Sequence, residues 1–269
     1  MATLLESCNN FFEQFTLSVL RKGKVPRHVG FILDGNRRFA RKAGANSTKF
    51  GHYEGFRQLE KVLDLCMQLG IEAVTVYAFS LENFNRSQDE VDYLMQLFCD
   101  AFDGFCEKNA LVEKYEIGVR FLGDLSRLPQ NVQDVVHKVT EQTKKNKNYD
   151  RRIFNVCCPY TSRDEMTTAI KETIELVKQG KITADEITDQ TIKDHLFTAN
   201  CPSLDILVRT SGEIRLSDFL LWQANDRCQI QFVNCYWPEF SLWKLLPILL
   251  EYQIYSDHQI QEQQQEIST

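Results

Sequence analysis

Residues 28–38 read His28-Val29-Gly30-Phe31-Ile32-Leu33-Asp34-Gly35-Asn36-Arg37-Arg38. The run from Val29 to Leu33 predicts a buried strand, because it is short, apolar and followed by polar residues. Asp34 and Gly35 then stand at the expected carboxyl end of that strand, directly before two arginines. The stretch therefore predicts a strand whose end carries charged groups suited to holding a ligand.

Short apolar runs alternate with longer helical patterns along the rest of the chain. Further strands are expected at 73–79, 119–122, 153–156, 204–208 and 229–233, and helices at 50–69, 88–108, 130–145, 162–179, 189–197 and 240–254. This alternation predicts an α/β protein with a mostly parallel central sheet flanked by helices. Ligands bind such sheets beyond the carboxyl ends of the strands, so the chemistry is expected directly after the strand runs.

The composition fits one domain and excludes some classes of function. The chain has 269 residues, of which 43% are hydrophobic, so it can bury a sizeable core. Its net charge of −6 argues against a nucleic-acid partner, because such proteins are usually basic over the contact face. Nine cysteines without a C-x-x-C pair favour buried, reduced thiols over disulfides or a zinc site, and hence a reducing compartment.

The N-terminal segment predicts an amphipathic helix. Residues 4–20 place apolar side chains at helical spacing, and the basic residues Arg21, Lys22 and Lys24 follow. This pattern suits a helix on a membrane surface and equally a helix packed on its own domain. No apolar run reaches the roughly 18 residues that a membrane-spanning helix needs, and we expect no signal peptide.

The first strand end has the groups that a magnesium diphosphate requires. Asp34 can hold a hard cation that also prefers phosphate oxygens. Gly35 allows close backbone approach, and Arg37 and Arg38 supply forked donors that match phosphate geometry. The alternative for this segment alone is an ordinary capping turn with solvated arginines.

Two more strand ends carry similar groups: Ser80, Asn83 and Arg86 after strand 73–79, and Arg209, Arg215 and Ser217 after strand 204–208. Local roles are the alternatives here. Ser87 and Glu90 suit a capping box for the next helix. Arg215 and Asp218 suit an i,i+3 ion pair on the surface, which is worth little. His52 is a further candidate, although a lone histidine is more often structural.

Together these segments resemble the cis-prenyltransferase family, which includes the undecaprenyl and dehydrodolichyl diphosphate synthases. The resemblance covers about residues 25 to 250 and rests on 28–38, Gly51-His52, 77–84, 209–217 and Trp237-Pro238-Glu239-Phe240. It implies an α/β fold with an apolar tunnel. It also implies repeated head-to-tail addition of isopentenyl diphosphate to farnesyl diphosphate, which makes a long-chain dehydrodolichyl diphosphate, the precursor of dolichol for protein glycosylation.

The resemblance also implies a role for each candidate residue. Asp34 would hold Mg²⁺ on the allylic diphosphate, and Asn36 and Asn83 would assist proton removal and positioning. The implied substrate-binding residues are Gly35, Arg37, Arg38, His52, Ser80, Arg86, Arg209, Arg215 and Ser217. Arg209, Arg215 and Ser217 would bind isopentenyl diphosphate, and Arg86 would bridge the two sites.

The helix expected at 88–108 gathers apolar residues on one side: Val91, Leu94, Met95, Phe98, Phe102 and Phe105. This stripe is a candidate wall for the growing apolar chain, and by pattern alone it is equally ordinary core. The segment between Arg41 and Gly51 lacks an arginine that family members carry there, and Lys49 is the candidate replacement.

Two further departures bear on assembly. Cys228 stands where bacterial homodimers carry a second metal-binding glutamate, and the C-terminus lacks their Arg-x-Gly. The resemblance therefore implies a heteromer with a Nogo-B-receptor-like subunit that supplies Arg-x-Gly, in peripheral contact with the endoplasmic reticulum membrane on its cytosolic face. The implied organisation is an amphipathic helix at 1–24, a catalytic domain at 25–255 and a polar tail at 256–269.

Two other functions remain open from the sequence. A non-catalytic scaffold subunit is the main alternative, because the family contains such pairs. Silent members lack the carboxylate of the Asp34 type and the pair of Arg209 and Arg215, and this chain keeps all three. The other alternative is an unrelated phosphate-binding α/β enzyme, such as a phosphatase.

Overall fold

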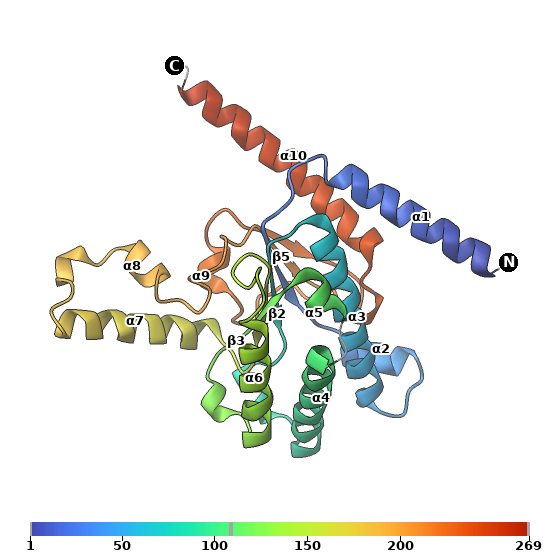
Figure 1. Ribbon diagram of the computed structural model, residues 1–269, viewed down its shortest axis with the longest axis horizontal. Coiled ribbons are helices and arrows are strands. Elements are labelled where there is room, and N and C mark those ends of the chain that lie inside the picture. The colour runs from blue at the N-terminus through green and yellow to red at the C-terminus, as the bar shows by residue number, and fades with distance from the viewer. Residues whose placement is uncertain (1, 108–109, 268–269) are drawn as a thin grey trace.

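A parallel sheet of six strands lies at the centre of the computed structural model, which describes residues 2–107 and 110–267, with side chains for 11–102 and 111–256 (Figure 1). The strands are β1 (His28–Ile32), β2 (Ala73–Tyr77), β3 (Gly118–Leu122), β4 (Ile153–Cys157), β5 (Ile206–Arg209) and β6 (Gln229–Phe232). Their order is β3-β4-β2-β1-β5-β6, and every neighbouring pair is parallel. The predicted α/β class and parallel sheet are confirmed.

The position of β1 in the sheet decides where a ligand can bind. β2 lies on one side of β1 and β5 on the other, so the order of the strands reverses between β1 and β5. Ile32 is in register with Tyr77 of β2 and Arg209 of β5. The carboxyl ends of these three strands are therefore level, and a crevice at such a reversal is the usual ligand site of an open α/β sheet.

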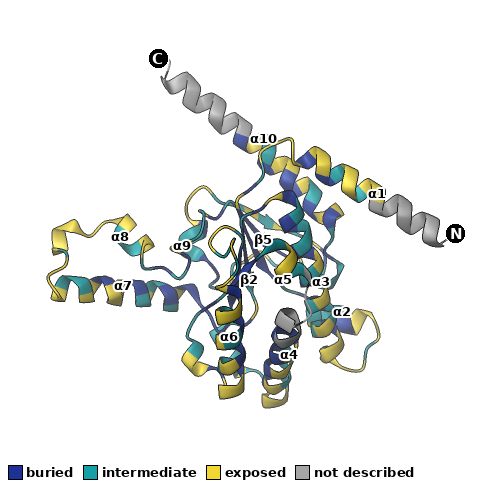
Figure 2. Cartoon of the chain, in the orientation of Figure 1, coloured by how far each residue is buried: buried dark blue, intermediate teal, exposed yellow. Residues whose placement is uncertain are grey.

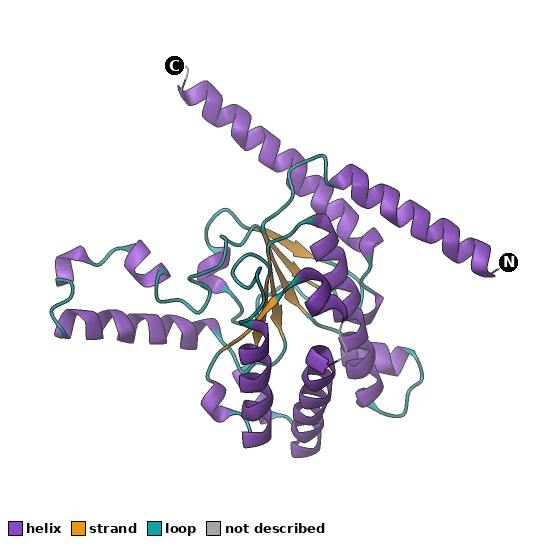
Figure 3. Ribbon diagram, viewed as in Figure 1, coloured by secondary structure: helices purple, strands orange, loops and turns teal. Residues whose placement is uncertain are grey.

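Helices cover both faces of the sheet (Figure 3). They are α1 (Ala2–Leu20), α2 (Asn36–Lys42), α3 (Thr48–Leu69), α4 (Gln88–Glu107), α5 (Ala110–Tyr115), α6 (Gln130–Thr143), α7 (Ser162–Lys178), α8 (Asp189–Lys193), α9 (Leu221–Ala224) and α10 (Leu242–Ile267). Short 3₁₀ helices span Leu81–Asn85, Leu125–Arg127, Ala184–Glu186 and Trp237–Glu239. In Figure 1, α7 and α8 extend away from the sheet as an arm.

Most element boundaries agree with the sequence to within a few residues, and the exceptions have local causes. β2 ends at Tyr77, two residues early, because the N–H groups of Ala78 and Phe79 both donate to the Cys157 carbonyl and turn the chain. β5 starts at Ile206 because the Asp205 carboxylate accepts the N–H groups of residues 27 and 28. The helix predicted at 189–197 is shorter, and the one at 240–254 continues to residue 267.

Nearly every position of β1 to β5 is buried, dark blue in Figure 2, whereas the edge strand β6 is intermediate to exposed. β1 and β4 are buried at every position, which is typical of a parallel sheet covered on both sides. The larger apolar cluster includes Phe31 and Val76 together with residues of α3, α4, α6 and α10. A smaller cluster around Tyr160 and Phe219 lies beside α9. The seven cysteines with described side chains are free thiols, as predicted; Cys8 and Cys106 lie outside that set.

Helix α1 packs on the body of the protein through one edge only. Leu17 and Leu20 are buried, whereas four other apolar side chains of the helix are more than half exposed: Phe11, Phe12, Phe15 and Val19. No helix in the described part of the chain is long and apolar enough to cross a bilayer. The range 256–269, predicted as a polar tail, continues α10 to residue 267, and its side chains beyond Ser256 lie outside the described set. The division at residues 24 and 255 stays a prediction.

Candidate active site

Asp34 lies at the carboxyl end of β1, between two arginines from different parts of the chain. Its Oδ2 accepts a hydrogen bond from Nη2 of Arg209 at 2.9 Å, and its Oδ1 lies 3.4 Å from Nη2 of Arg38. Burial by itself raises the pKa of the Asp34 carboxyl, but Arg209, the Gly35 N–H and Arg38 outweigh it and hold the pKa below its ordinary value. Asp34 is therefore a carboxylate at neutral pH.

The turn after Asp34 depends on a glycine. Gly35 has φ of 102°, a left-handed conformation, and forms the N-cap of α2. A Cβ atom here would lie 2.8 Å from the Tyr236 ring and 3.0 Å from Oγ of Ser211. The backbone at the start of α2 is thus packed closely, and its first residues, Asn36, Arg37 and Arg38, line the pocket.

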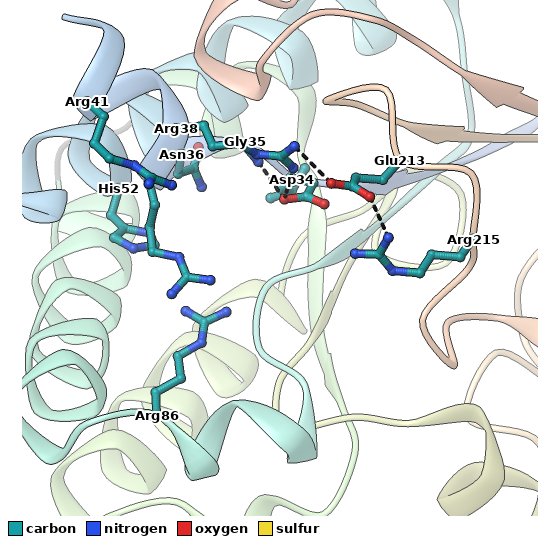
Figure 4. A pocket seen from close by; sticks show the side chains of 11 residues that line it. Asp34, Gly35, Asn36, Arg38, Arg41, His52, Arg86, Glu213 and Arg215 are labelled. Carbon is teal, nitrogen blue, oxygen red and sulfur yellow. Dashed lines mark hydrogen bonds and ion pairs between the residues drawn. The ribbon is translucent and has the colours of Figure 1, made fainter.

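A polar pocket of about 390 Å³ opens above the ends of β1 and β2 (Figure 4). Its lining residues are Leu33, Asp34, Gly35, Asn36, Arg37, Arg38, Arg41, His52, Arg86, Glu213 and Arg215. The pocket therefore gathers eight of the twelve predicted site residues, seven of them from the part of the chain before residue 209 and the eighth, Arg215, from the β5–α9 loop. It also includes Leu33, Arg41 and Glu213, which the sequence did not predict as site residues.

Two glutamates pair with most of these arginines. Glu213 lies 2.8 Å from Arg38 and also binds Arg215. Glu90 lies 2.9 Å from Arg86 and 3.7 Å from Arg37, so its carboxylate is turned toward the pocket and away from the capping role predicted with Ser87. The pairs Arg38–Glu213 and Arg37–Glu90 could not be predicted from the sequence, because their partners lie on elements far apart in the chain.

Arg41 was not predicted as a site residue, and the replacement of the family arginine by Lys49 stays a prediction. Arg41 lines the pocket, and within the described residues it has no ion pair. Lys49 is not in the lining; its ammonium lies 4.7 Å from the centre of the Tyr93 ring. One signal could have found Arg41: it follows Arg37 and Arg38 by one helical turn, which places it on the same face of α2.

His52 and Asn36 lie deeper, where the polar pocket ends. Burial, with smaller contributions from the charges around it, lowers the pKa of His52 to about 4, so the imidazole is neutral at pH 7. His52 Nε2 and Asn36 Oδ1 are buried and have no hydrogen-bond partner among the described residues. Unsatisfied buried polar atoms are costly, so both are candidates to bind a ligand atom.

The remaining predicted residues hold the loops together in this structure. Ser80 and Asn83 form a reciprocal capping box for the 3₁₀ helix Leu81–Asn85: Oγ of Ser80 accepts from Glu82 N, and Oδ1 of Asn83 accepts from Ser80 N at 3.1 Å. Neither residue lines the polar pocket. Their predicted roles in catalysis and substrate binding stay predictions.

Arg209 is almost fully buried and connects β1 to the β5–α9 loop, residues 210–220. Besides Asp34, its guanidinium donates to Oγ of Ser217 at 2.8 Å and to the Arg215 carbonyl oxygen. Arg209 and Ser217 therefore lie behind the pocket wall. The surface ion pair considered for Arg215 and Asp218 is not formed, because Arg215 binds Glu213 and Asp218 binds Arg163.

An apolar pocket of about 110 Å³ adjoins the polar one. It lies between α3, α4 and β2, and its lining includes Phe56, Leu59, Val76, Leu94, Met95, Phe98, Ala101 and Phe102. Leu33, Asn36 and His52 line both pockets. Most of the predicted α4 stripe thus faces this pocket, although Val91 does not, and Phe105 lies outside the described side chains. A passage through the protein is not shown.

The side chains at this site can hold a divalent cation only together with the bound ligand, whose oxygens would supply the remaining coordination positions. No cluster of three metal-binding side chains occurs within the part of the chain whose side chains are described. Asp34 provides one ionised carboxylate, partly exposed at the pocket wall. Mg²⁺ is commonly held in this way, by one or two carboxylates together with phosphate oxygens and water.

Comparison with known proteins identifies the family. Residues 32–259 match the prenyltransferase family described as undecaprenyl diphosphate synthase. The chain belongs to the cis-prenyltransferases. A dehydrodolichyl diphosphate synthase complex subunit of Schizosaccharomyces pombe is 40% identical over 90% of each chain. The human subunit of the same name is 40% identical over 94% of this chain and 75% of its own.

A solved cis-prenyltransferase-type structure has the same fold. Lavandulyl diphosphate synthase from Lavandula x intermedia, crystallised with dimethylallyl diphosphate, superposes with a TM-score of 0.76. It is 32% identical and covers 85% of this chain and 95% of its own. The predicted family and enzyme class are therefore confirmed, and the scaffold alternative is not favoured.

Proposed function

We propose that this cis-prenyltransferase elongates farnesyl diphosphate with isopentenyl diphosphate to make a long-chain dehydrodolichyl diphosphate. The observation that carries the proposal is the junction of the two pockets at Leu33, Asn36 and His52. One side of the junction is rich in arginine and the other is apolar. An allylic diphosphate, with a charged head and a hydrocarbon chain, has this same polarity. The names of the relatives support the dolichol product.

The pocket suits a reaction in which a diphosphate leaves. Negative charge develops on the leaving group as the allylic C–O bond breaks, and preorganised guanidinium groups stabilise that charge. Arg37, Arg38 and Arg86 reach this space from α2 and the β2 loop. His52 is neutral and can donate one hydrogen bond without adding charge. Asn36 Oδ1, buried and without a hydrogen-bond partner among the described residues, can accept a hydrogen bond from a bound ligand.

Magnesium and the product path complete the proposal. Mg²⁺ held by Asp34 and the diphosphate would neutralise the charge of the leaving group. The growing chain would enter the apolar pocket between α3 and α4, whose present volume of about 110 Å³ is too small for a long product. A long product would therefore require the helices to separate or the chain to pass out between them, and the apolar tunnel stays a prediction.

The test of function is magnesium-dependent incorporation of labelled isopentenyl diphosphate by Asp34→Asn and Asp34→Ala variants. Asn keeps an acceptor for Arg209, so the fold should be retained while the metal-binding charge is lost. We expect incorporation to fall by at least about 100-fold in both variants. Asp124→Asn, at an exposed ion pair after β3, is the matched control. Wild-type incorporation by Asp34→Asn would contradict the proposal.

We also propose that a second, Nogo-B-receptor-like subunit completes the site with an Arg-x-Gly segment. The relatives are named complex subunits, which supports a heteromer. Residues 250–269 contain no Arg-x-Gly. Co-expression with a subunit that bears Arg-x-Gly should raise incorporation at least tenfold, and full activity of the purified chain alone would exclude the requirement.

The exposed apolar face of α1 supports a third part of the proposal, peripheral contact with the cytosolic face of the endoplasmic reticulum membrane. Phe11, Phe12 and Phe15 are each more than half exposed on one side of the helix, and Lys22 and Lys24 follow it. Aromatic and basic groups in this arrangement bind bilayer interfaces. Sedimentation with vesicles containing anionic lipid should decrease in a variant with all three phenylalanines changed to serine, and unchanged binding would contradict the proposal.

A further inference from the structure

The β5–α9 loop is held in a backbone conformation that its residues do not favour. Ser217, Asp218 and Leu220 have φ values of 49°, 61° and 47°. Side chains other than glycine rarely adopt left-handed conformations, and each costs on the order of 1 kcal/mol or more. Contacts around the loop must therefore stabilise this arrangement, which sets the positions of Arg215 and Ser217.

The N-terminus of α7 makes those contacts through Asp218. Ser162 N donates to the Asp218 carbonyl oxygen at 2.8 Å, and Arg163 N donates to Oδ1 of Asp218 at 3.2 Å. Nε of Arg163 lies 2.7 Å from Oδ2 of the same side chain. Leu221 N then donates to Oγ of Ser162 at 2.7 Å. A carboxylate at a helix N-terminus is also favoured by the helix dipole.

Arg163 reaches a second loop of the site as well. Its Nη2 lies 3.7 Å from Glu82, in the 3₁₀ helix that immediately precedes Arg86. On the inner side of the loop, the Tyr77 hydroxyl donates to the Ser217 carbonyl at 3.3 Å, and the Tyr77 ring stacks on Phe219 at 4.6 Å. The segment after β4, which contributes nothing to the pocket lining, thus connects the loops that follow β2 and β5.

We propose that Asp218, held by Ser162 and Arg163, is a positioning residue for the isopentenyl diphosphate site. It acts through Ser217 and Arg215: the Ser217 hydroxyl and the Arg215 carbonyl both accept hydrogen bonds from Arg209, so the conformation of the loop sets where these three groups lie. The inference rests on the proposed function, because it takes Arg209, Arg215 and Ser217 to bind isopentenyl diphosphate. Its structural part, the stabilisation of the loop, does not depend on that assignment.

The first experiment compares steady-state kinetics of Asp218→Asn and Arg163→Gln with the wild type, assembled with the partner subunit where activity needs it. Asn tolerates left-handed φ and keeps one acceptor for Arg163 N, so the first variant removes the charge and the second acceptor, which binds Nε of Arg163. We expect the KM for isopentenyl diphosphate to rise roughly tenfold, as for loss of a hydrogen bond to a charged group. The KM for farnesyl diphosphate and the melting temperature should change little. Arg163→Lys, which keeps the ion pair, should restore part of the loss.

Arg127→Gln is the matched control, because Arg127 makes an exposed ion pair with Asp124 at 3.0 Å, outside the pocket lining. Kinetic constants of Asp218→Asn equal to those of this control would overturn the proposal. An equal rise in the KM for both substrates would also overturn the proposal, because a general destabilisation of the site would explain that result.

A second experiment separates this inference from the proposed function. Amide hydrogen exchange of residues 210–221 should be faster in Asp218→Asn than in the wild type and in Arg127→Gln, whatever reaction the protein catalyses. Unchanged exchange in this segment would overturn the positioning role. A wild-type protein that incorporates no isopentenyl diphosphate would instead overturn the proposed function, while the exchange result would still decide whether Asp218 stabilises the loop.

Discussion

Single side chains set the charge of the polar pocket. Five arginines and two carboxylates, Asp34 and Glu213, line it, so the lining carries a net charge of +3 (five minus two). Asp34, Glu213 and the nearby Glu90 together contact four of the five arginines. The neutral state of His52 leaves this balance unchanged at pH 7. Pairing with a carboxylate lowers the free-energy cost of placing several arginines close together. An anionic ligand can replace the carboxylate as the hydrogen-bond acceptor when it binds.

We expect Arg41 to bind the ligand without first giving up an ion pair to a described residue. It lines the pocket without an ion pair to any described residue. Arg41→Gln should raise the KM for the allylic diphosphate roughly tenfold and leave kcat nearly unchanged, because it removes binding shared by ground and transition states. Steady-state kinetics with farnesyl diphosphate as the varied substrate would measure this.

Lys42→Gln is the control for Arg41→Gln. Lys42 is the next residue of α2, but it binds Glu239 at 2.7 Å and lies outside the lining. If both variants show the same KM, Arg41 does not bind the substrate.

At the scale of elements, the contact between α2 and α3 positions Asn36. Two glycines of α3 allow it: a Cβ atom at Gly51 would lie 1.9 Å from the Asn36 carbonyl oxygen, and one at Gly55 would lie 2.5 Å from Asn36 Oδ1. Trp237 joins the same region, because its N–H donates to the Asp34 carbonyl at 3.0 Å and its indole donates to the Gly55 carbonyl at 2.7 Å. The Trp-Pro-Glu-Phe segment therefore supports the end of β1.

Gly51→Ala should move α3 away from Asn36. The added Cβ atom meets a backbone oxygen, so the two helices must separate. We expect the free energy of unfolding to fall by about 1–3 kcal/mol, despite the better helix propensity of alanine. The kcat should fall as well, because His52 is the next residue of α3. Denaturant unfolding and kinetics would measure both effects. Arg57→Ala, at an exposed position of the same helix, should leave both nearly unchanged; similar effects in the two variants would contradict this account.

At the scale of the whole molecule, a buried polar chain crosses the sheet. Nδ1 of His28 donates to the Pro202 carbonyl at 2.8 Å, so Nε2 must accept from Oγ1 of Thr75 at 2.7 Å, and Thr75 in turn accepts from Asn155. This arrangement needs a neutral imidazole. Burial lowers the pKa of His28 to about 4, compared with 6.5 for a solvated histidine.

The pH dependence of stability follows from that shift. Between about pH 6.5 and 4 the unfolded chain binds a proton at His28 and the folded protein does not, so stability falls as the pH falls through this window. We expect the free energy of unfolding to decrease by roughly 3 kcal/mol on account of His28, with His52 adding in the same direction. Denaturant unfolding would measure this: from pH 7 to pH 5, the free energy of unfolding should decrease less in His28→Gln than in the wild type. His137→Gln, at an exposed site, should behave as wild type, and an unchanged pH profile for His28→Gln would contradict the assignment.

The sequence by itself determined the fold class and the location of the site. A strand buried on both faces reads as a short apolar run, and in a parallel sheet the residues after such runs meet at one edge. Asp34, Arg86 and Arg215 could therefore be assigned to one site. The amphipathic character of α1 could be read in the same way, because helical periodicity is a local property of the chain.

Only the tertiary structure decided which side chains contact one another. Asp34 and Arg209 are 175 residues apart in sequence, and Asp218 and Arg163 are 55 apart, so no local pattern relates them. Ser80 and Asn83 show the same limit, because each could cap a turn or face a ligand; the structure shows the cap, and their roles in binding and catalysis stay predictions. Periodicity fixes the face on which a side chain lies, but the partner it meets depends on how distant elements pack.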